Sequence, residues 1–439
     1  MTFINRGWIA SVIPMLFVAF PASAQDSSIF VQCPASTELH PAGDGIKCGH
    51  LVAGDGMVTM ADDAYVNDDG SVGGKQMYVF SFAELPGEEM ATRPGIPDAW
   101  INPDAAYPGL VMEQGMLAAN APAPTISLDE DDELFLSLSN VGMVIRPDLF
   151  DPHTIHWHGF PQAAPVFDGV PDSSISINMG ASLTYYYNAK DAGTYMYHCH
   201  VEAAEHMQMG MLGNLFVRPR QNKLPDGAVL GSHTHSNPDE GPGDDSLVGD
   251  KYAYNDGDGS TLYDVEFPIQ IGSFDPDFHD ASFNVQPLPF SGMKDRYFLL
   301  NGRGYPDTVN TGVLSTPDPV TGAPRPSQPV SSLISATSGQ KILLRISNLN
   351  VTNFYTLGTN GMPMNVVALD ARLLRDGAGN NMNYKTSSLT LGGGQSADVI
   401  LDTTGLAAGS VYFLYATNLD RLSNDAENFG GMMTEIHIN

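Results

Sequence analysis

Two short stretches in the first half of the chain gather the side chains that could bind a transition metal. They are His153-Thr154-Ile155-His156-Trp157-His158-Gly159 and Tyr197-His198-Cys199-His200, and the second is followed by His206 and Met211. Imidazoles bind divalent transition metals, and thiolates and thioethers favour softer ions such as Cu(I). The two stretches therefore predict a metal centre.

The spacing within each stretch predicts which side chains share a face. Successive side chains on a β-strand alternate between its two faces, so residues two apart point the same way and residues an odd number apart do not. If the two stretches lie side by side in a sheet, their ligands separate into two groups. The first group is His153 with Cys199, and the second is His156, His158, His198 and His200.

The two groups suit different chemistry. His206 and Met211 would complete the first group, and two imidazoles, one thiolate and a weak axial thioether are the ligands of a blue electron-transfer copper centre. The second group offers imidazoles only, which favours copper that binds oxygen species, and the residues next to Cys199 would link it to the first. Zinc is the main competitor, but the paired Cys at CxxC spacing typical of its structural sites do not occur.

The pattern HxxHxHG, then HCH, then His and Met five residues apart resembles the copper-binding domain of multicopper oxidases, the laccase-like family. The resemblance implies copper as the cofactor. It implies type 1 copper ligands at His153, Cys199 and His206, with Met211 in the weak axial position. It also implies that half of the ligands of an oxygen-reducing cluster are His156, His158, His198 and His200. Five residues separate His200 from His206, where the family more often has three.

Hydrophobic patterning predicts an all-β fold. Apolar residues alternate with a period of two over short segments bounded by turn residues, and there is no convincing amphipathic helix. Strands are expected at 77–82, 123–128, 134–139, 174–178, 183–187, 193–198, 342–346, 365–369 and 397–401. The resemblance implies two cupredoxin-like Greek-key β-sandwich domains joined by a long Gly/Asp/Pro-rich linker.

The chain can be divided on composition and motifs. The expected parts are a signal peptide at 1–24, an irregular N-terminal extension at 25–75, a copper-binding domain at 76–220, a linker at 221–262 and a second domain at 263–439. Residues 300–307 and 393–399 resemble the copper-free second domain of three-domain multicopper oxidases. Residues 412–418 stand where the first domain has its His-Cys-His segment, without a Cys or His to hold blue copper.

The N-terminus predicts export. Arg6, an apolar run over residues 8–20 and the small-residue ending 22–24 are typical of a secretory signal peptide. The run is too short for a membrane span. In a periplasmic or secreted protein, Cys33 and Cys48 are expected to form a disulfide, which leaves Cys199 for metal. A formal net charge of −30 argues against nucleic acid as a partner.

One chain shows only half of the family's cluster ligands. Multicopper oxidases take four imidazoles from each of two domains, whereas the second domain here offers only His279 and His437, neither in an HxH pair. Three solutions remain open. The linker pair His233 and His235 contributes, a neighbouring subunit contributes as in trimeric two-domain members of the family, or the four histidines hold a smaller copper centre.

These observations predict an exported copper-dependent oxidoreductase. A small-molecule or metal-ion donor would pass single electrons through the first group to the second, where dioxygen is reduced. One alternative is a copper nitrite reductase-like enzyme, because His153 and His158 are five residues apart and His198 precedes Cys199; against it, His156 stands where such reductases carry an acid.

A second alternative is a non-enzymatic electron carrier or copper-handling protein. The thioethers of Met207, Met209 and Met211 favour it, since they suit Cu(I). Glu202 and Glu205 could orient donors, relay protons or simply be solvated.

Overall fold

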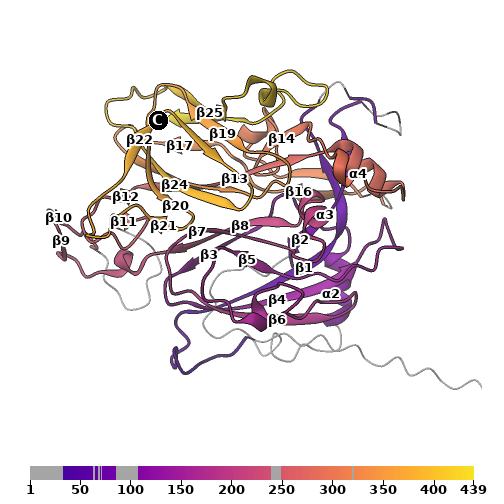
Figure 1. Ribbon diagram of the computed structural model, residues 1–439, viewed down its shortest axis with the longest axis horizontal. Helices are drawn as coiled ribbons and strands as arrows, with labels where there is room; N and C mark the ends of the chain where they lie inside the picture. The colour runs from indigo at the N-terminus through magenta and orange to yellow at the C-terminus, as the bar shows by residue number, and fades with distance from the viewer. Residues whose placement is uncertain are drawn as a thin grey trace, which may run out of the picture.

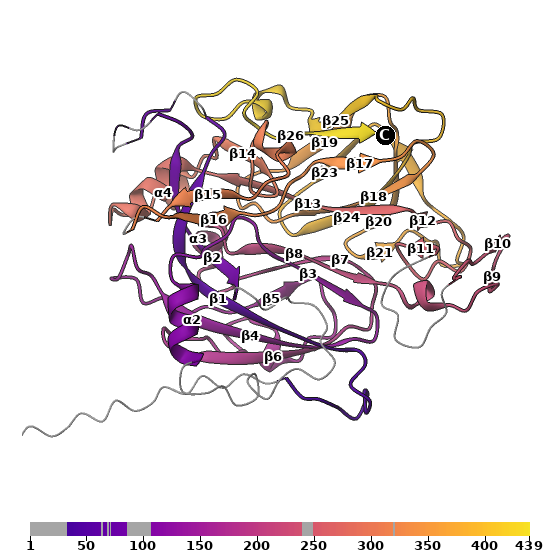
Figure 2. The same cartoon turned by 180° about the vertical axis from the view of Figure 1, so that it is seen from behind.

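The structure is a computed structural model that describes residues 33–62, 65–67, 70, 72–85, 107–238, 249–318 and 321–439. Strands dominate it, as the alternating patterns predict, and they form two stacked sandwiches (Figures 1 and 2). The expected signal peptide lies outside the described residues. Within the described ranges, no helix is both long enough and apolar enough to cross a membrane.

The first sandwich has two four-stranded sheets. One sheet has the order β2 (Gln76–Glu84), β1 (Ile46–Thr59), β4 (Glu133–Gly142) and β6 (Ser182–Asn188). The other has the order β3 (Ala123–Asp129), β8 (Leu212–Arg218), β7 (Gly193–His198) and β5 (His156–His158). Leu134, Leu136 and Leu138 are fully buried between the sheets, as expected for alternate residues on the inward face of a strand.

The second sandwich repeats this arrangement with extra strands at its edges. One sheet has β14 (Tyr297–Leu300), β13 (Val265–Phe274), β18 (Lys341–Asn348), β24 (Gln395–Asp402), β20 (Met364–Leu369) and β21 (Arg372–Leu373), with β22 (Tyr384–Thr386) also on β20. The other has β17 (Ile334–Ala336), β26 (Met433–Ile438), β25 (Val411–Ala416), β19 (Tyr355–Thr359) and β23 (Ser388–Leu391).

Strand pairing supports two diverged copies of one unit. The parallel pair β1 and β4 matches β13 and β18, and the parallel pair β3 and β8 matches β17 and β26. In the first sandwich β7 lies between β8 and β5, and in the second sandwich β25 lies between β26 and β19 in the same way.

Short elements connect the sheets. The helices are α2 (Tyr107–Gly115), α3 (Ala203–Gln208) and α4 (Pro276–Phe283), and the 3-10 turns are η1 (Pro165–Phe167), η2 (Arg220–Lys223), η3 (Phe290–Gly292), η4 (Asp307–Val309) and η5 (Leu419–Leu422). The β-hairpins are β9 (Val229–Leu230) with β10 (His233–Thr234), β11 (Lys251–Tyr252) with β12 (Leu262–Tyr263), and β15 (Leu314–Pro317) with β16 (Pro324–Gln328).

Three sequence-based expectations need correction. Residues 46–59 form β1 inside the first sandwich, so the extension at 25–75 is not irregular there. Its Gly and Asp residues have low strand propensity, but pairing with β2 and β4 stabilises the strand and buries it. Residues 174–178 form no strand and make only a bridge from Ile177 to His153. The described part of the linker at 221–262 folds into two hairpins. The Cys33–Cys48 disulfide is confirmed.

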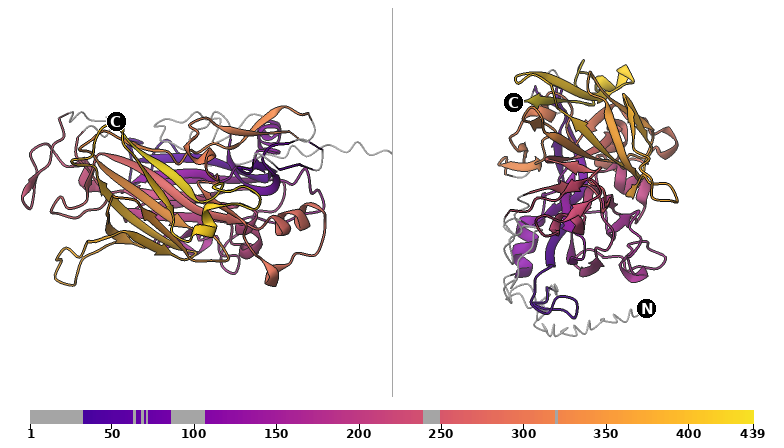
Figure 3. Two further views of the ribbon diagram at one scale, coloured as in Figure 1. Left: turned by 90° about the horizontal axis from the view of Figure 1, so that it is seen from above. Right: turned by 90° about the vertical axis from the view of Figure 1, so that its left-hand side faces the viewer.

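Buried charges of the second sandwich lie where it meets the first, and the right-hand view of Figure 3 shows the two sandwiches one above the other. Arg345 on β18 is fully buried and lies 2.7 Å from a carboxylate oxygen of Glu266 and 3.5 Å from one of Asp398. From the first sandwich, the Thr194 hydroxyl donates to Asp398 over 2.5 Å. Such pairs are costly to break, because removing one partner leaves the other charge buried without compensation. This contact holds the inner sheet of the first sandwich, which carries both ligand stretches, against the second.

Candidate metal centre

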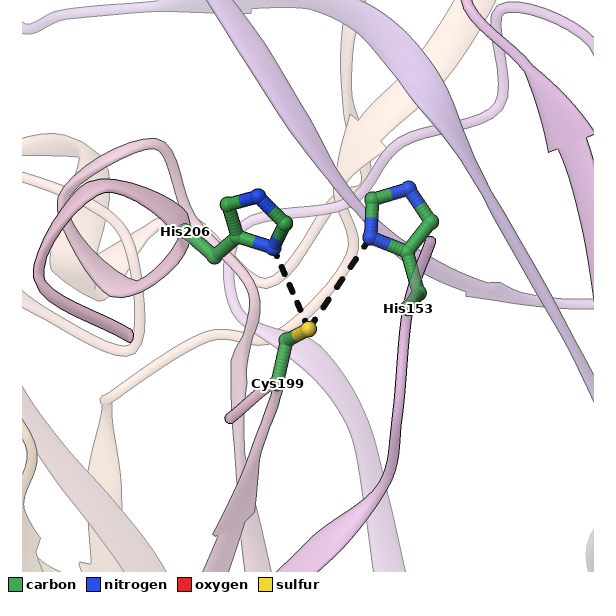
Figure 4. Close-up of side chains that lie close together, drawn as sticks. All are labelled: His153, Cys199 and His206. Carbon is green, nitrogen blue, oxygen red and sulfur yellow. Dashed lines mark hydrogen bonds between the residues drawn. The ribbon is translucent and has the colours of Figure 1, made fainter. Parts of the chain in front are cut away.

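Three of the predicted ligands meet in a fully buried cluster at one end of β7. The Nδ1 atoms of His206 and His153 lie 3.1 Å and 3.9 Å from the Cys199 Sγ. Candidate ligand atoms of the three residues all lie within 4.8 Å of one another. Figure 4 shows both imidazoles directed at the sulfur, with their two dashed lines converging on it.

Each of these side chains comes from a different element. Cys199 directly follows β7, His153 precedes β5 and is held by its bridge to Ile177, and His206 lies on α3. The five residues between His200 and His206 contain the start of that helix, so the longer spacing is taken up by a helical turn. The sequence did not predict α3, because a helix of 6 residues is too short to show a periodic pattern.

Met211 is placed by the backbone next to two of these residues. Its carbonyl accepts the Cys199 N–H over 3.2 Å, and its own N–H donates to the His206 carbonyl over 2.9 Å. The Met211 side chain is fully buried in the same apolar cluster as Cys199. The weak axial role predicted for this thioether therefore suits its position.

Burial sets the protonation of this cluster. Desolvation lowers the pKa of His206 to about 4 and holds that of His153 well below its usual value, so both rings are neutral with lone pairs available. The same burial raises the pKa of the Cys199 thiol to about 11, opposed by the Thr154 N–H that points at the sulfur over 3.4 Å. A soft divalent ion would displace the thiol proton on binding. Two neutral imidazoles, a thiol and a nearby thioether fit copper.

The four remaining histidines of the two stretches form a second cluster, separate from the sulfur. β5 and β7 pair so that His156 lies opposite His198. The ring centroid of His156 is 5.2 Å from that of His198, 5.0 Å from that of His200 and 6.0 Å from that of His158. The separation that strand alternation predicts is therefore present.

Hydrogen bonds orient two of these rings. His156 Nδ1 lies 2.5 Å from the Asp168 carbonyl, and His198 Nδ1 lies 2.8 Å from the Cys199 carbonyl. A backbone carbonyl accepts only from a protonated nitrogen, so Nε2 of each ring carries the lone pair available to a metal. The fixed tautomers are those of imidazoles arranged as ligands.

A cavity of about 500 Å³ opens between this cluster and the second sandwich. It is lined by His158, His198, His200, Ala203, Ala204, Met207, Leu349, Asn350, Val351, Thr352, Asn353, Phe354, Gly393 and Gly394. Among the described residues that line the cavity, those from the second sandwich provide amides, a hydroxyl and apolar groups but no imidazole. No local pattern predicts this wall of the cavity, because its residues from the second sandwich lie 150 or more positions after His198.

The other histidines in the described ranges are engaged elsewhere. His233 contacts Asp250 over 2.8 Å and His235 contacts the Tyr252 hydroxyl over 3.0 Å. Their hairpin lies at the opposite end of the molecule from α3 (Figures 1 and 2), which argues against the linker pair as cluster ligands in this chain. His279 contacts the Tyr78 carbonyl over 2.6 Å, and His437 contacts Glu435 over the same distance.

The second sandwich has lost the equivalent of the sulfur cluster. Ala416 N–H donates to the Met432 carbonyl as Cys199 does to Met211, and Met432 N–H donates to Arg421 as Met211 does to His206. The matching positions are thus Ala416 for Cys199 and Arg421 for His206. A guanidinium, which has no lone pair to offer, now lies 4.5 Å from the Phe298 ring centroid.

Comparisons with known proteins agree with this architecture. Two family models, each described as multicopper oxidase, match residues 105–222 and 291–434. The chain is 35% identical over 115 residues to multicopper oxidase MCE of Talaromyces pinophilus, covering 25% of this chain and 18% of that protein. It is 25% identical over 338 residues to a laccase of Neurospora crassa, covering 75% of this chain and 42% of that protein. The matches thus span less than half the length of these relatives.

Solved structures share the fold. Blue copper oxidase from Nitrosomonas europaea superposes with a TM-score of 0.55 at 20% identity, over 90% of this chain and 86% of that one. The multicopper oxidase mgLAC gives the same TM-score at 17% identity, with the same coverage of both chains. With both family models matched, one on each sandwich, the chain belongs to the multicopper oxidase family, whose cofactor is copper.

Proposed function

We propose that this protein is a copper-dependent oxidoreductase that passes single electrons from a donor to dioxygen. His153, Cys199, His206 and Met211 would hold the copper that accepts electrons, and His156, His158, His198 and His200 would hold the copper at which dioxygen is reduced. Copper bound at the two clusters would supply the one-electron redox chemistry, and the chain's own residues fix where electrons, protons and dioxygen can move.

The observation that carries the proposal is the covalent connection between the clusters. The thiol of Cys199 belongs to the buried sulfur cluster, while His198 and His200 on either side belong to the imidazole cluster beside the cavity. Electrons can therefore cross from one cluster to the other through one or two residues of continuous backbone. A protein that only stored copper would have no use for this link.

The two clusters also differ in access. The sulfur cluster is sealed from solvent, since all three residues are fully buried, which suits electron transfer without exchange of ligands. The imidazole cluster borders a cavity large enough for dioxygen and several waters. Donors would approach on the side of His206, where its Nε2 lies 3.9 Å from an Asp151 carboxylate oxygen. Acidic residues there would favour a cationic donor such as a metal ion.

Copper analysis, a visible spectrum and oxygen uptake test the proposal together. The protein is expected to be blue, to carry at least two coppers per chain and to consume oxygen when a phenol or a reducing metal ion is added. One copper per chain with a blue band and no oxygen uptake would identify an electron carrier instead. A colourless preparation after treatment with cupric salt would refute the blue centre.

A second candidate is a reductase with a smaller copper centre. It is favoured by the cavity wall, which offers the imidazole cluster no further histidine from within the described chain. Anaerobic turnover of nitrite with two coppers per chain would support it. A neighbouring subunit that completes a larger cluster, for instance in a trimer, would show as three or four coppers per chain and an oligomer in solution.

Export to the periplasm or the exterior forms part of the proposal. It is supported by the signal-like residues 1–24 and by the disulfide, which persists in oxidising compartments. Mass spectrometry of the mature N-terminus would test it.

A further inference from the structure

A buried carboxylate lies behind the second-sandwich wall of the cavity. Asp295 lies two positions before the start of β14 and is only 2% exposed. Its Oδ2 accepts hydrogen bonds from the hydroxyls of Ser273 and Thr352. Its Oδ1 is buried and accepts no hydrogen bond of normal length among the described residues, although the Gln208 side chain lies close enough to act on the carboxylate. A structural anchor would be expected to use both oxygens, so this carboxylate has capacity to hold a proton.

Thr352 connects this carboxylate to the cavity. It lines the cavity together with His158, His198 and His200 on the other side. Its hydroxyl also accepts a hydrogen bond from the Asn353 side chain over 3.0 Å. A hydroxyl can accept one proton while it donates another, so Thr352, which contacts Asp295 and lines the cavity, is placed to connect the two.

The reaction proposed for the cavity needs such a path. Reduction of dioxygen to water takes up one proton for every electron. Among the described residues that line the cavity there is no Asp, Glu or Lys. Asp295 is reached from it through a single hydroxyl, and it follows Lys294, which is exposed to the solvent from which protons come.

The surroundings of Asp295 favour its protonated form. Burial raises its pKa and the nearby Asp275 carboxylate adds to the shift, while hydrogen bonds from Ser273, Thr352 and Gln208 oppose it. The Tyr355 phenol faces the same carboxylate from β19, and the Gln208 amide faces it from α3. None of the groups with the largest effect on the pKa of Asp295 is a cation.

We propose that Asp295 supplies protons to the cavity through the Thr352 hydroxyl. The O–H bond of the Asp295 carboxyl breaks as its proton passes to the Thr352 oxygen, while Thr352 releases its own proton to reduced oxygen or water in the cavity. The electrons come from the donor, and solvent then reprotonates Asp295. This inference rests on the proposed function, because a proton path matters only where the cavity hosts a proton-consuming reduction.

Three variants of the copper-loaded protein test it. Asp295→Asn removes the carboxyl group that would carry the proton. Thr352→Val removes the hydroxyl while it keeps the volume of the side chain. Ser273→Ala is the matched control. Ser273 contacts the same oxygen of Asp295 but lies on β13 and does not line the cavity. Oxygen uptake is expected to fall at least about tenfold in the first two variants and to stay within about twofold in the third. Bleaching of the blue colour by the donor without oxygen should match wild type in all three.

Equal oxygen uptake in Thr352→Val and wild type would overturn the inference, as would an equal loss in Ser273→Ala. Infrared spectra of the metal-free protein give a second readout. A protonated-carboxyl band that vanishes in Asp295→Asn should shift in Thr352→Val, and an unshifted band would show that the contact is not made. If the wild-type protein consumes no oxygen, the proposed function fails. The infrared spectra would still show whether Asp295 is protonated and contacts the Thr352 hydroxyl.

Discussion

The close approach of Gly394 to His158 makes the imidazole cluster depend on one glycine of the second sandwich. A Cβ at position 394 would lie 2.9 Å from Cε1 and 3.1 Å from Nε2 of His158, and the φ of Gly394 is +86°. Real Cβ atoms do not come within 3.0 Å of another heavy atom, so Gly394→Ala must displace the ring. The left-handed backbone costs a non-glycine residue a further 1–2 kcal/mol, roughly.

The expected result is loss of function at the imidazole cluster with the sulfur cluster intact. Displacing this ligand is expected to lower the copper content by up to one ion per chain and oxygen uptake by up to about a hundredfold, which is the cost of a misplacement of about 1 Å. The blue absorption should persist, because His153, Cys199 and His206 form a separate cluster that does not contain His158. Metal analysis and absorption spectra of the same sample measure both effects.

Gly405→Ala separates the contact from the backbone strain. Gly405 has nearly the same φ, +82°, and a Cβ there would meet nothing within 4 Å. This variant should lose a similar amount of stability, about 1–2 kcal/mol in denaturant unfolding, while it keeps its copper and its oxygen uptake. If the two alanine variants show the same copper content and activity, His158 does not depend on the wall formed by Gly394 and the reasoning is wrong.

Three further predictions concern the rest of the molecule. Cys199→Ser should abolish both the blue colour and donor-dependent oxygen uptake, and retained uptake would show that electrons take another route. Replacing Cys33 and Cys48 by Ser opens a loop with a sequence separation of 15, which should lower the free energy of unfolding by about 3 kcal/mol in denaturant titrations. Glu266 has its pKa lowered to about 2 although burial opposes the shift, because Arg345 and Arg218 lie beside it. A depressed pKa gives stability that is present above the unfolded-state pKa of about 4.3 and is lost as the pH falls toward 2, so wild type should destabilise over that window more steeply than Glu266→Gln.

Much of the metal chemistry is encoded locally. The alternation of side chains along a strand separates Cys199 from His198 and His200, and the observed pairing of β5 with β7 gives both clusters the membership that spacing alone predicts. Strands 193–198, 183–187 and 134–139 were predictable from the period-2 patterning of the sequence, although in the structure all of 193–198 and nearly all of 134–139 are buried on both faces. Such patterns survive folding because they follow from the geometry of single strands.

Other features depend on contacts between distant segments, and no local pattern reports them. β1 was missed because Gly49, Gly54 and Gly56 give it little strand propensity, and pairing with β2 and β4 overrides that preference. The stretch 174–178 alternates as a strand does, yet it finds no neighbouring edge beyond one bridge.

The sequence by itself determined the ligand types, their division between two faces and the all-β character of the chain, because these follow from residue chemistry and a period of two. Only the tertiary structure decided that His206 reaches Cys199 through a helical turn, that the second sandwich closes the cavity with Gly394 and Thr352, and that the hairpin of His233 and His235 lies far away. Those outcomes depend on how two sandwiches pack across buried charges, and packing between segments hundreds of residues apart leaves no periodic trace in the sequence.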